Sequence, residues 1–301
     1  MKVLKRLLIA LLCLCVLLAA GAYWYDRVGQ KADPNFNTAV AHPAYAASGP
    51  RIVFDQAHRN FHTASGRYRP FAELLRHDGY RVDSNTAPFS AETLRRADVL
   101  IVANALGEDG HETHSAFTPE EIDALATWVD SGGSLLLIAD HSPFGWAARD
   151  LAKRLGVTMY GLFARDDAYN DGDNERLVFS RANHLLADNP ITDGRSPAER
   201  VNRVVTFTGQ SLVGPAGSTQ LLRLSPGAYD WASRNLRYPA AGHAQGLAFA
   251  LGRGRVVVFG EAALFSAQVD ALGIRMGMNK PGNDDRQVAL NVVHWLSGAL
   301  R

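Results

Sequence analysis

Cysteine is almost absent from this chain of 301 residues, which contains only Cys13 and Cys15. Both lie inside one apolar run near the N-terminus. The rest of the chain can therefore form no disulfide and offers no thiol as a nucleophile or metal ligand. Its stability has to come from an ordinary hydrophobic core, which about 250 residues can supply.

An excess of charge of one sign is missing as well. The chain has 31 Lys and Arg residues against 30 Asp and Glu residues, and the arginines are scattered. Nucleic-acid binding would require a clustered basic face, so we predict no nucleic-acid partner. The acidic stretch 164–175 lacks the spacing of an EF-hand, and the G-x-S-x-G motif of serine hydrolases does not occur.

The N-terminus carries the longest apolar run. The basic segment MKVLKR precedes nineteen uncharged residues, from Leu7 to Tyr25. As a helix this run would be about 28 Å long, enough to cross a bilayer. We predict a signal anchor or transmembrane helix over 1–25, with the cytoplasmic membrane as partner and the remaining chain on the periplasmic side of the inner membrane. The alternative is a signal peptide cleaved near Ala22, which would release a secreted protein.

The remainder is predicted to be a linker followed by one domain. Residues 26–50 contain Pro43 and Pro50 and show no periodicity, which indicates a linker. From residue 51 to 301, short apolar runs alternate with amphipathic segments. This alternation predicts an α/β domain with a mostly parallel sheet. The segment GLAFALGRGRVVVFGE predicts a β-hairpin, and DDRQVALNVVHWLSGAL predicts a closing helix.

Acidic residues end three of the predicted strands, at Asp55, Asp140 and Glu261. In an open α/β sheet, ligands bind beyond the carboxyl ends of the strands. We therefore expect these side chains to lie at one edge of the sheet. Histidines follow two of the acids in sequence, and these are His58, His62 and His141.

These side chains permit three interpretations. Asp55, His58 and His62 are the types of ligand that zinc or another divalent metal prefers, although their spacing matches no named zinc signature. Without a metal, the same edge would form a polar ligand site. The acids can also simply cap helices or bind loop amides. For catalysis the candidate residues are Asp140, His141 and Glu261.

Five segments carry a resemblance to a known family: FDQAHRNFHTASGRYRPF, LLLIADHSPFG, TFTGQSL, GRGRVVVFGEAALFSAQ and GNDDRQVALNVVHWL. Their order resembles an uncharacterised bacterial family of unknown function in the class I glutamine amidotransferase-like superfamily. The resemblance implies a flavodoxin-like, three-layer fold. Amidotransferases of that superfamily have a nucleophilic cysteine at the turn after a central strand. The corresponding turn here is Ala139-Asp140-His141-Ser142, so thiol-based amidotransfer is excluded.

Two functions follow as expectations. In the first, an exported domain binds or hydrolyses a small polar or carbohydrate-type ligand. Asp140 or Glu261 would then act as general base, and His58 or His141 would orient the substrate or hold a metal. In the second, the domain has no chemistry and binds a ligand or partner in the cell envelope.

Overall fold

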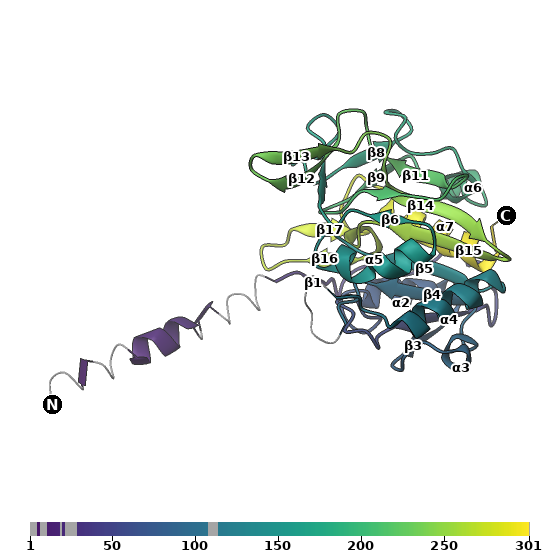
Figure 1. Cartoon of the computed structure of the whole chain (residues 1–301), viewed down its shortest axis with the longest axis horizontal. Coiled ribbons are helices and arrows are strands. Elements are labelled where there is room, and N and C mark those ends of the chain that lie inside the picture. Colours follow the sequence, from purple (N-terminus) through teal and green to yellow (C-terminus); the bar gives the residue numbers. More distant parts are fainter. Residues whose placement is uncertain (1–4, 7–10, 19, 22–28, 108–113, 301) are drawn as a thin grey trace.

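The centre of the fold is a sheet with a parallel half and an antiparallel half (Figure 1). The computed structural model describes residues 5–6, 11–18, 20–21, 29–107 and 114–300. The parallel half has the order β3-β2-β4-β5-β15. Its strands are β2 (Arg51–Asp55), β3 (Arg81–Asn85), β4 (Val99–Ala103), β5 (Ser134–Ile138) and β15 (Gly254–Phe259).

The antiparallel half continues from β15. The β14–β15 pair is the predicted hairpin, with Gly246 opposite Phe259 and Leu251 opposite Gly254. Next come β10 and β6, while β11 also pairs with β14. These strands are β6 (Thr158–Met159), β10 (Leu212–Val213), β11 (Thr219–Arg223) and β14 (Ala244–Leu251).

Helices cover both faces of the central sheet. The side chains of β5 alternate between two apolar clusters, because successive residues of a strand point to opposite faces. Leu136 and Ile138 belong to the cluster under α2 and α7, and Leu135 and Leu137 belong to the one under α3, α4 and α5. The helices are α2 (Arg69–His77), α3 (Ala91–Leu94), α4 (Pro119–Asp130), α5 (Phe144–Arg154) and α7 (Asp285–Ser297).

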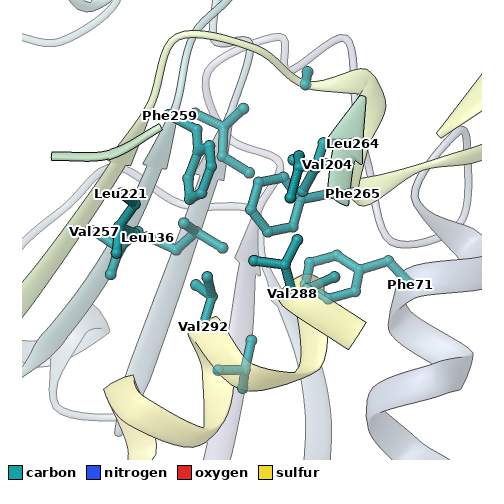
Figure 2. Close-up of a cluster of buried hydrophobic side chains, with 14 of the residues drawn as sticks. Phe71, Leu136, Val204, Leu221, Val257, Phe259, Leu264, Phe265, Val288 and Val292 are labelled. Carbon is teal, nitrogen blue, oxygen red and sulfur yellow. The ribbon is translucent and has the colours of Figure 1, made fainter. Parts of the chain in front are cut away.

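The closing helix α7 packs where it was predicted. Val292 points from α7 toward Leu136 of β5, and Val288 lies beside Phe265 (Figure 2). All four side chains are fully or almost fully buried. Because α7 packs on β4, β5 and β15, the C-terminal end of the chain belongs to the same core as its first strands.

Smaller elements surround this core. One sheet joins β1 (Lys31–Ala32), β16 (Ala267–Val269) and β17 (Arg275–Gly277). A second joins β7 (Phe163–Arg165), β12 (Tyr229–Ser233) and β13 (Leu236–Pro239), and a third joins β8 (Val178–Ser180) and β9 (Arg203–Val205). The short helices are α6 (Pro190–Asp193), η1 (Pro197–Glu199) and η2 (Ala263–Phe265).

The stretch 29–50, within the predicted linker, packs against the domain. β1 pairs with β16, and the Tyr45 ring lies edge-on to Tyr80 with ring centroids 5.1 Å apart. The Tyr45 N–H also donates to the carbonyl of Asp78 at 3.2 Å. This part of the chain is therefore held by hydrogen bonds and apolar contacts.

The predicted membrane anchor needs correction. No helix among the described residues is long and apolar enough to cross a membrane. Residues 11–18 and 20–21 are helical, whereas 7–10, 19 and 22–25 lie outside the described part. The predictions of a cytoplasmic-membrane partner and of a location in the inner membrane facing the periplasm are therefore wrong.

Candidate functional site

The three strand-end acids lie at the same edge of the sheet. β2, β5 and β15 are parallel, and Asp55 ends β2, while Asp140 and Glu261 follow β5 and β15. The order of the strands separates Asp55 from Asp140 and Glu261. β5 and β15 are neighbours, whereas β4 lies between β2 and β5. The edge consequently holds two separate clusters of polar side chains.

The first cluster is centred on Asp140. Its Oδ1 accepts the N–H of Ala262 at 2.7 Å, and its Oδ2 accepts the Nδ2 of Asn104 at 2.7 Å. The Asn104 Oδ1 in turn accepts the N–H of Asp140 at 2.9 Å. The Asp140 side chain is half-buried, and each carboxylate oxygen keeps lone-pair capacity for a further partner. The carboxyl group of Asp140 is therefore fixed in position and can still accept further hydrogen bonds.

Asn104, which holds Asp140 in place, has a left-handed backbone conformation. It directly follows β4, is fully buried, and has φ = 47°. Among residues other than glycine, asparagine is one of the few that tolerate this region. Such outliers gather at functional sites, where surrounding contacts hold them in place. Its amide fixes both the backbone and the carboxylate of Asp140.

Glu261 is a positioning residue in this cluster. Its Oε1 accepts the N–H groups of Ala263 at 2.7 Å and Phe207 at 3.2 Å, and its Oε2 accepts that of Leu264 at 2.9 Å. The side chain is fully buried. It holds the turn after β15, and that turn supplies the Ala262 N–H to Asp140. Glu261 therefore acts on Asp140 through the backbone.

The electrostatics of the cluster favour protonated acids. Burial raises the pKa of Asp140 to about 7, although the hydrogen bonds from Asn104 and Ala262 partly oppose the shift. Burial, and next the charge of Asp140, raise the pKa of Glu261 well above its ordinary value. Asp140, whose pKa lies near 7, is therefore the group that exchanges a proton near neutral pH.

His62 completes the cluster. Its Nδ1 lies 3.1 Å from the Nδ2 of Asn104, so we assign Nδ1 as the acceptor and place the hydrogen on Nε2. Burial, and next the charge of Arg67, lower the pKa of His62 to about 3. The ring packs against that of Tyr68, with centroids 4.6 Å apart. His62 is therefore a neutral imidazole.

Tyr68 and Phe61 form the surroundings of the cluster. The buried Tyr68 hydroxyl donates to the carbonyl of Ala262 at 2.8 Å. Phe61 is 44% exposed and packs on Phe144, with centroids 5.5 Å apart. Arg67 lies over the Phe61 ring at 3.9 Å. The residues near Asp140 thus include an exposed aromatic surface.

The side chain of His141 contacts Phe163 and Ser142 rather than the Asp140 cluster. Its ring stacks on Phe163 with centroids 3.9 Å apart, and its Nδ1 donates to the carbonyl of Ser142 at 2.7 Å. Burial lowers its pKa, and hydrogen bonding to Ser142 opposes this. The half-buried ring follows Asp140 in sequence, but the structure records no hydrogen bond between the two side chains.

The second cluster joins Asp55, His58 and Glu121. The His58 Nδ1 is 2.8 Å from the Asp55 Oδ2, and its Nε2 is 2.8 Å from the Glu121 Oε1. The imidazole packs between Phe89 and Phe117 at 4.5 and 4.7 Å. Burial alone would lower the pKa of His58, but the two carboxylates raise it. Because both ring nitrogens face carboxylate oxygens, we assign both as donors and the His58 ring as an imidazolium.

This second cluster does not have the donors of a metal site. Both nitrogens of His58 already donate to carboxylates, so neither has a lone pair for a metal. His62 contacts Asn104 and Tyr68 rather than Asp55. In the ranges 29–107 and 114–300, no group of three or more His, Cys, Asp or Glu side chains gathers as metal ligands would. The structure does not bring the three candidate metal ligands to one point.

Sequence reasoning missed two residues of these clusters. Asn104 ends the apolar run DVLIVAN, so it matches the pattern of a polar residue at a strand end, which we applied only to acids. Glu121 stands three residues after Thr118, the spacing of a capping box at the start of α4, and this pattern indicates no second role. Its side chain does accept the Thr118 N–H, but it also accepts from His58 and from the N–H of Phe89.

The chain belongs to the family described as a domain of unknown function, DUF4350, which matches residues 60–268 and hence more than half of the chain. The matched region contains both clusters except Asp55 and His58. A comparison with curated proteins found no match.

Solved structures resemble the fold at low identity. The N-terminal domain of mmIFT52 is 16% identical with a TM-score of 0.59, over 82% of this chain and 97% of that domain. A ThuA-like protein from Bacteroides uniformis is 14% identical with a TM-score of 0.46, over 88% and 95%. A cytoplasmic protein from Salmonella typhimurium is 13% identical with a TM-score of 0.45, over 84% and 99%. At these identities the likeness concerns the fold alone.

Proposed function

We propose that the protein binds a small polar or carbohydrate-type ligand at the Asp140 cluster and that Asp140 exchanges a proton with it. The observation that carries the proposal is a half-buried carboxyl group, held by Asn104 and Ala262, with its pKa raised to about 7 by burial. A general acid or base works best when its pKa lies near the working pH. The reaction class that fits is hydrolysis by acid–base assistance.

The surrounding residues have distinct roles in this proposal. Asn104 and the Ala262 N–H hold the carboxyl group of Asp140. His62, neutral and with its hydrogen on Nε2, supplies a polar group that does not change charge near pH 7. Phe61 offers an apolar surface to the ligand. Asp140 accepts a proton from a water or hydroxyl group when ionised, and returns it to the leaving group when protonated.

We further propose that the fold is flavodoxin-like and that the family belongs to the class I glutamine amidotransferase-like superfamily. The order β3-β2-β4-β5-β15 supports this, because in chain order these strands run 2-1-3-4-5, which is the flavodoxin-like order. Helices on both faces also agree with a three-layer fold. Thiol-based amidotransfer is no part of the proposal, because Cys13 and Cys15 are the only cysteines.

The test uses the full chain with p-nitrophenyl glycosides as hydrolysis probes and the corresponding free sugars as binding probes. We expect hydrolysis whose rate changes with an apparent pKa near 7. The Asp140→Asn variant should lose about 10²–10⁴-fold in rate, as is typical when a general acid–base is removed. Asp150→Asn is the matched control, because Asp150 is exposed on α5. Equal rates in both variants would refute the role of Asp140.

A binding function without chemistry is the second candidate. The other acids favour it, because the carboxyl groups of Glu261, Asp55 and Glu121 are buried and already hydrogen-bonded to protein groups. In that case the sugars would bind to the parent chain, binding would weaken in Asp140→Asn, and no glycoside would be hydrolysed. If neither sugars nor glycosides interact with the parent, a carbohydrate-type ligand is excluded.

A further inference from the structure

A cavity of about 380 Å³ borders the turn that carries Glu261. Phe207 and Ala263 line it, and the backbone N–H groups of both donate to the Glu261 carboxyl group. The opposite wall comes from the β16–β17 hairpin, including Ile274 and Met276. The cavity is therefore a separate space from the Asp140 cluster, although Glu261 contacts residues of both.

Three cationic side chains line this cavity: Arg176, Arg275 and Lys280. Among the described residues that line it, none is acidic. Lys280 forms an ion pair with Asp171. Asp171 also forms an ion pair with Arg203 at 2.8 Å, so two cations share one carboxylate. The walls therefore carry positive charge that the neighbouring acids do not neutralise.

The two arginines retain unused hydrogen-bond donors. The Nε of Arg176 is buried without a hydrogen-bond partner, and its guanidinium carbon lies 5.5 Å from the centroid of the Phe207 ring. The side chain of Arg275, at the start of β17, makes no hydrogen bond or ion pair with any residue in the described ranges. A buried donor without a partner is costly, so a ligand oxygen at this position would be favourable.

Apolar side chains complete the lining. Phe207, Ile274 and Met276 contribute ring, branched and thioether surface, and Ile274 is 56% exposed. Ligand sites commonly combine such apolar walls with a few polar groups that fix the orientation of the ligand. Guanidinium groups are suited to carboxylate and phosphate oxygens because they present paired N–H donors.

We propose that this cavity is a second binding site, specific for a small organic anion. A carboxylate or phosphate group contacts Arg176, Arg275 and Lys280, and the apolar part of the ligand lies against Phe207 and Met276. The site goes beyond the proposed function, because none of its cations belongs to the Asp140 cluster.

Isothermal titration calorimetry of the full chain tests the proposal with phenyl phosphate, benzoate and benzyl alcohol. We expect at least one of the two anions to bind and the uncharged alcohol not to bind. The preferred anion identifies the oxyanion as phosphate or carboxylate. Arg275→Gln should weaken anion binding at least tenfold. Arg234→Gln, an exposed arginine in the β12–β13 turn, is the matched control and should bind as the parent does.

Three outcomes would overturn the proposal: neither anion binds, benzyl alcohol binds as tightly as the anions, or Arg275→Gln binds as tightly as the parent. Arg275 is exposed, so its replacement should leave the fold intact, and an unchanged melting temperature checks this. Arg176→Gln serves as a second variant with the same expected loss. Asp140→Asn should bind the anions normally, which separates this result from that of the proposed function.

Discussion

The raised pKa of Asp140 predicts how the stability of the protein depends on pH. Burial raises this pKa from 3.8 to about 7 in the folded state. The folded protein then holds a proton at pH values where the unfolded chain has released it. The stabilisation is fully present below pH 3.8 and is lost as the pH rises through 7. At 1.36 kcal/mol per pKa unit, the loss is at most about 4 kcal/mol.

Replacing Asp140 with Asn removes this titration. The free energy of unfolding of Asp140→Asn, measured relative to the parent, should therefore rise by up to about 4 kcal/mol between pH 4 and pH 8. At pH 4 the variant should be less stable than the parent, because its amide nitrogen cannot accept one of the two hydrogen bonds from Asn104 and Ala262. That loss is about 1–3 kcal/mol.

Urea denaturation of parent, Asp140→Asn and Asp150→Asn at intervals between pH 4 and pH 8 provides the measurement. Asp150 is exposed, so its variant should follow the parent at every pH. Glu261 also titrates with a raised pKa in all three proteins, and the difference between the curves removes most of its effect. Parallel curves for the parent and Asp140→Asn would refute the assignment of a raised pKa to Asp140.

Two further predictions concern stability. His58→Ala leaves the carboxylates of Asp55 and Glu121 buried without their cation, so urea denaturation at pH 5 should show a loss of about 3–5 kcal/mol. That loss should shrink as the pH rises above 6.5, because the raised pKa of His58 makes its contribution disappear at high pH; a loss below 1 kcal/mol at pH 5 contradicts the ion-pair interpretation. Asn104→Gly should be about 1–2 kcal/mol more stable than Asn104→Ala, because alanine resists a φ of 47°. Equal melting temperatures for these two variants would contradict that argument.

Much of the central sheet was predictable from local pattern. The run SLLLI is wholly apolar because β5 is buried on both faces. Thr118 and Glu121 form the capping box that their spacing indicates at the start of α4. The β14–β15 hairpin and α7 also lie where the sequence placed them. In these segments the periodicity, caps and turn residues all lie within a few positions of one another, so the sequence contains the whole signal.

The N-terminal segment shows where a local pattern misleads. The stretch 26–50 lacks periodicity, yet β1 adds to the edge of β16, more than 230 residues later in the chain. Strand addition at an edge uses backbone hydrogen bonds, which leave no trace in side-chain pattern. The same holds for β7, which pairs with β12 more than 60 residues later in the chain.

The sequence by itself determined that Asp55, Asp140 and Glu261 would end strands, because an apolar run followed by an acid is a local signal. Only the tertiary structure decided how they are divided. Because β4 lies between β2 and β5, Asp55 lies in a cluster with His58 and Glu121. Asp140 instead contacts Asn104 and the turn held by Glu261. Hydrogen-bond partners and burial set the pKa values of Asp140 and Glu261, and both depend on which strands lie side by side.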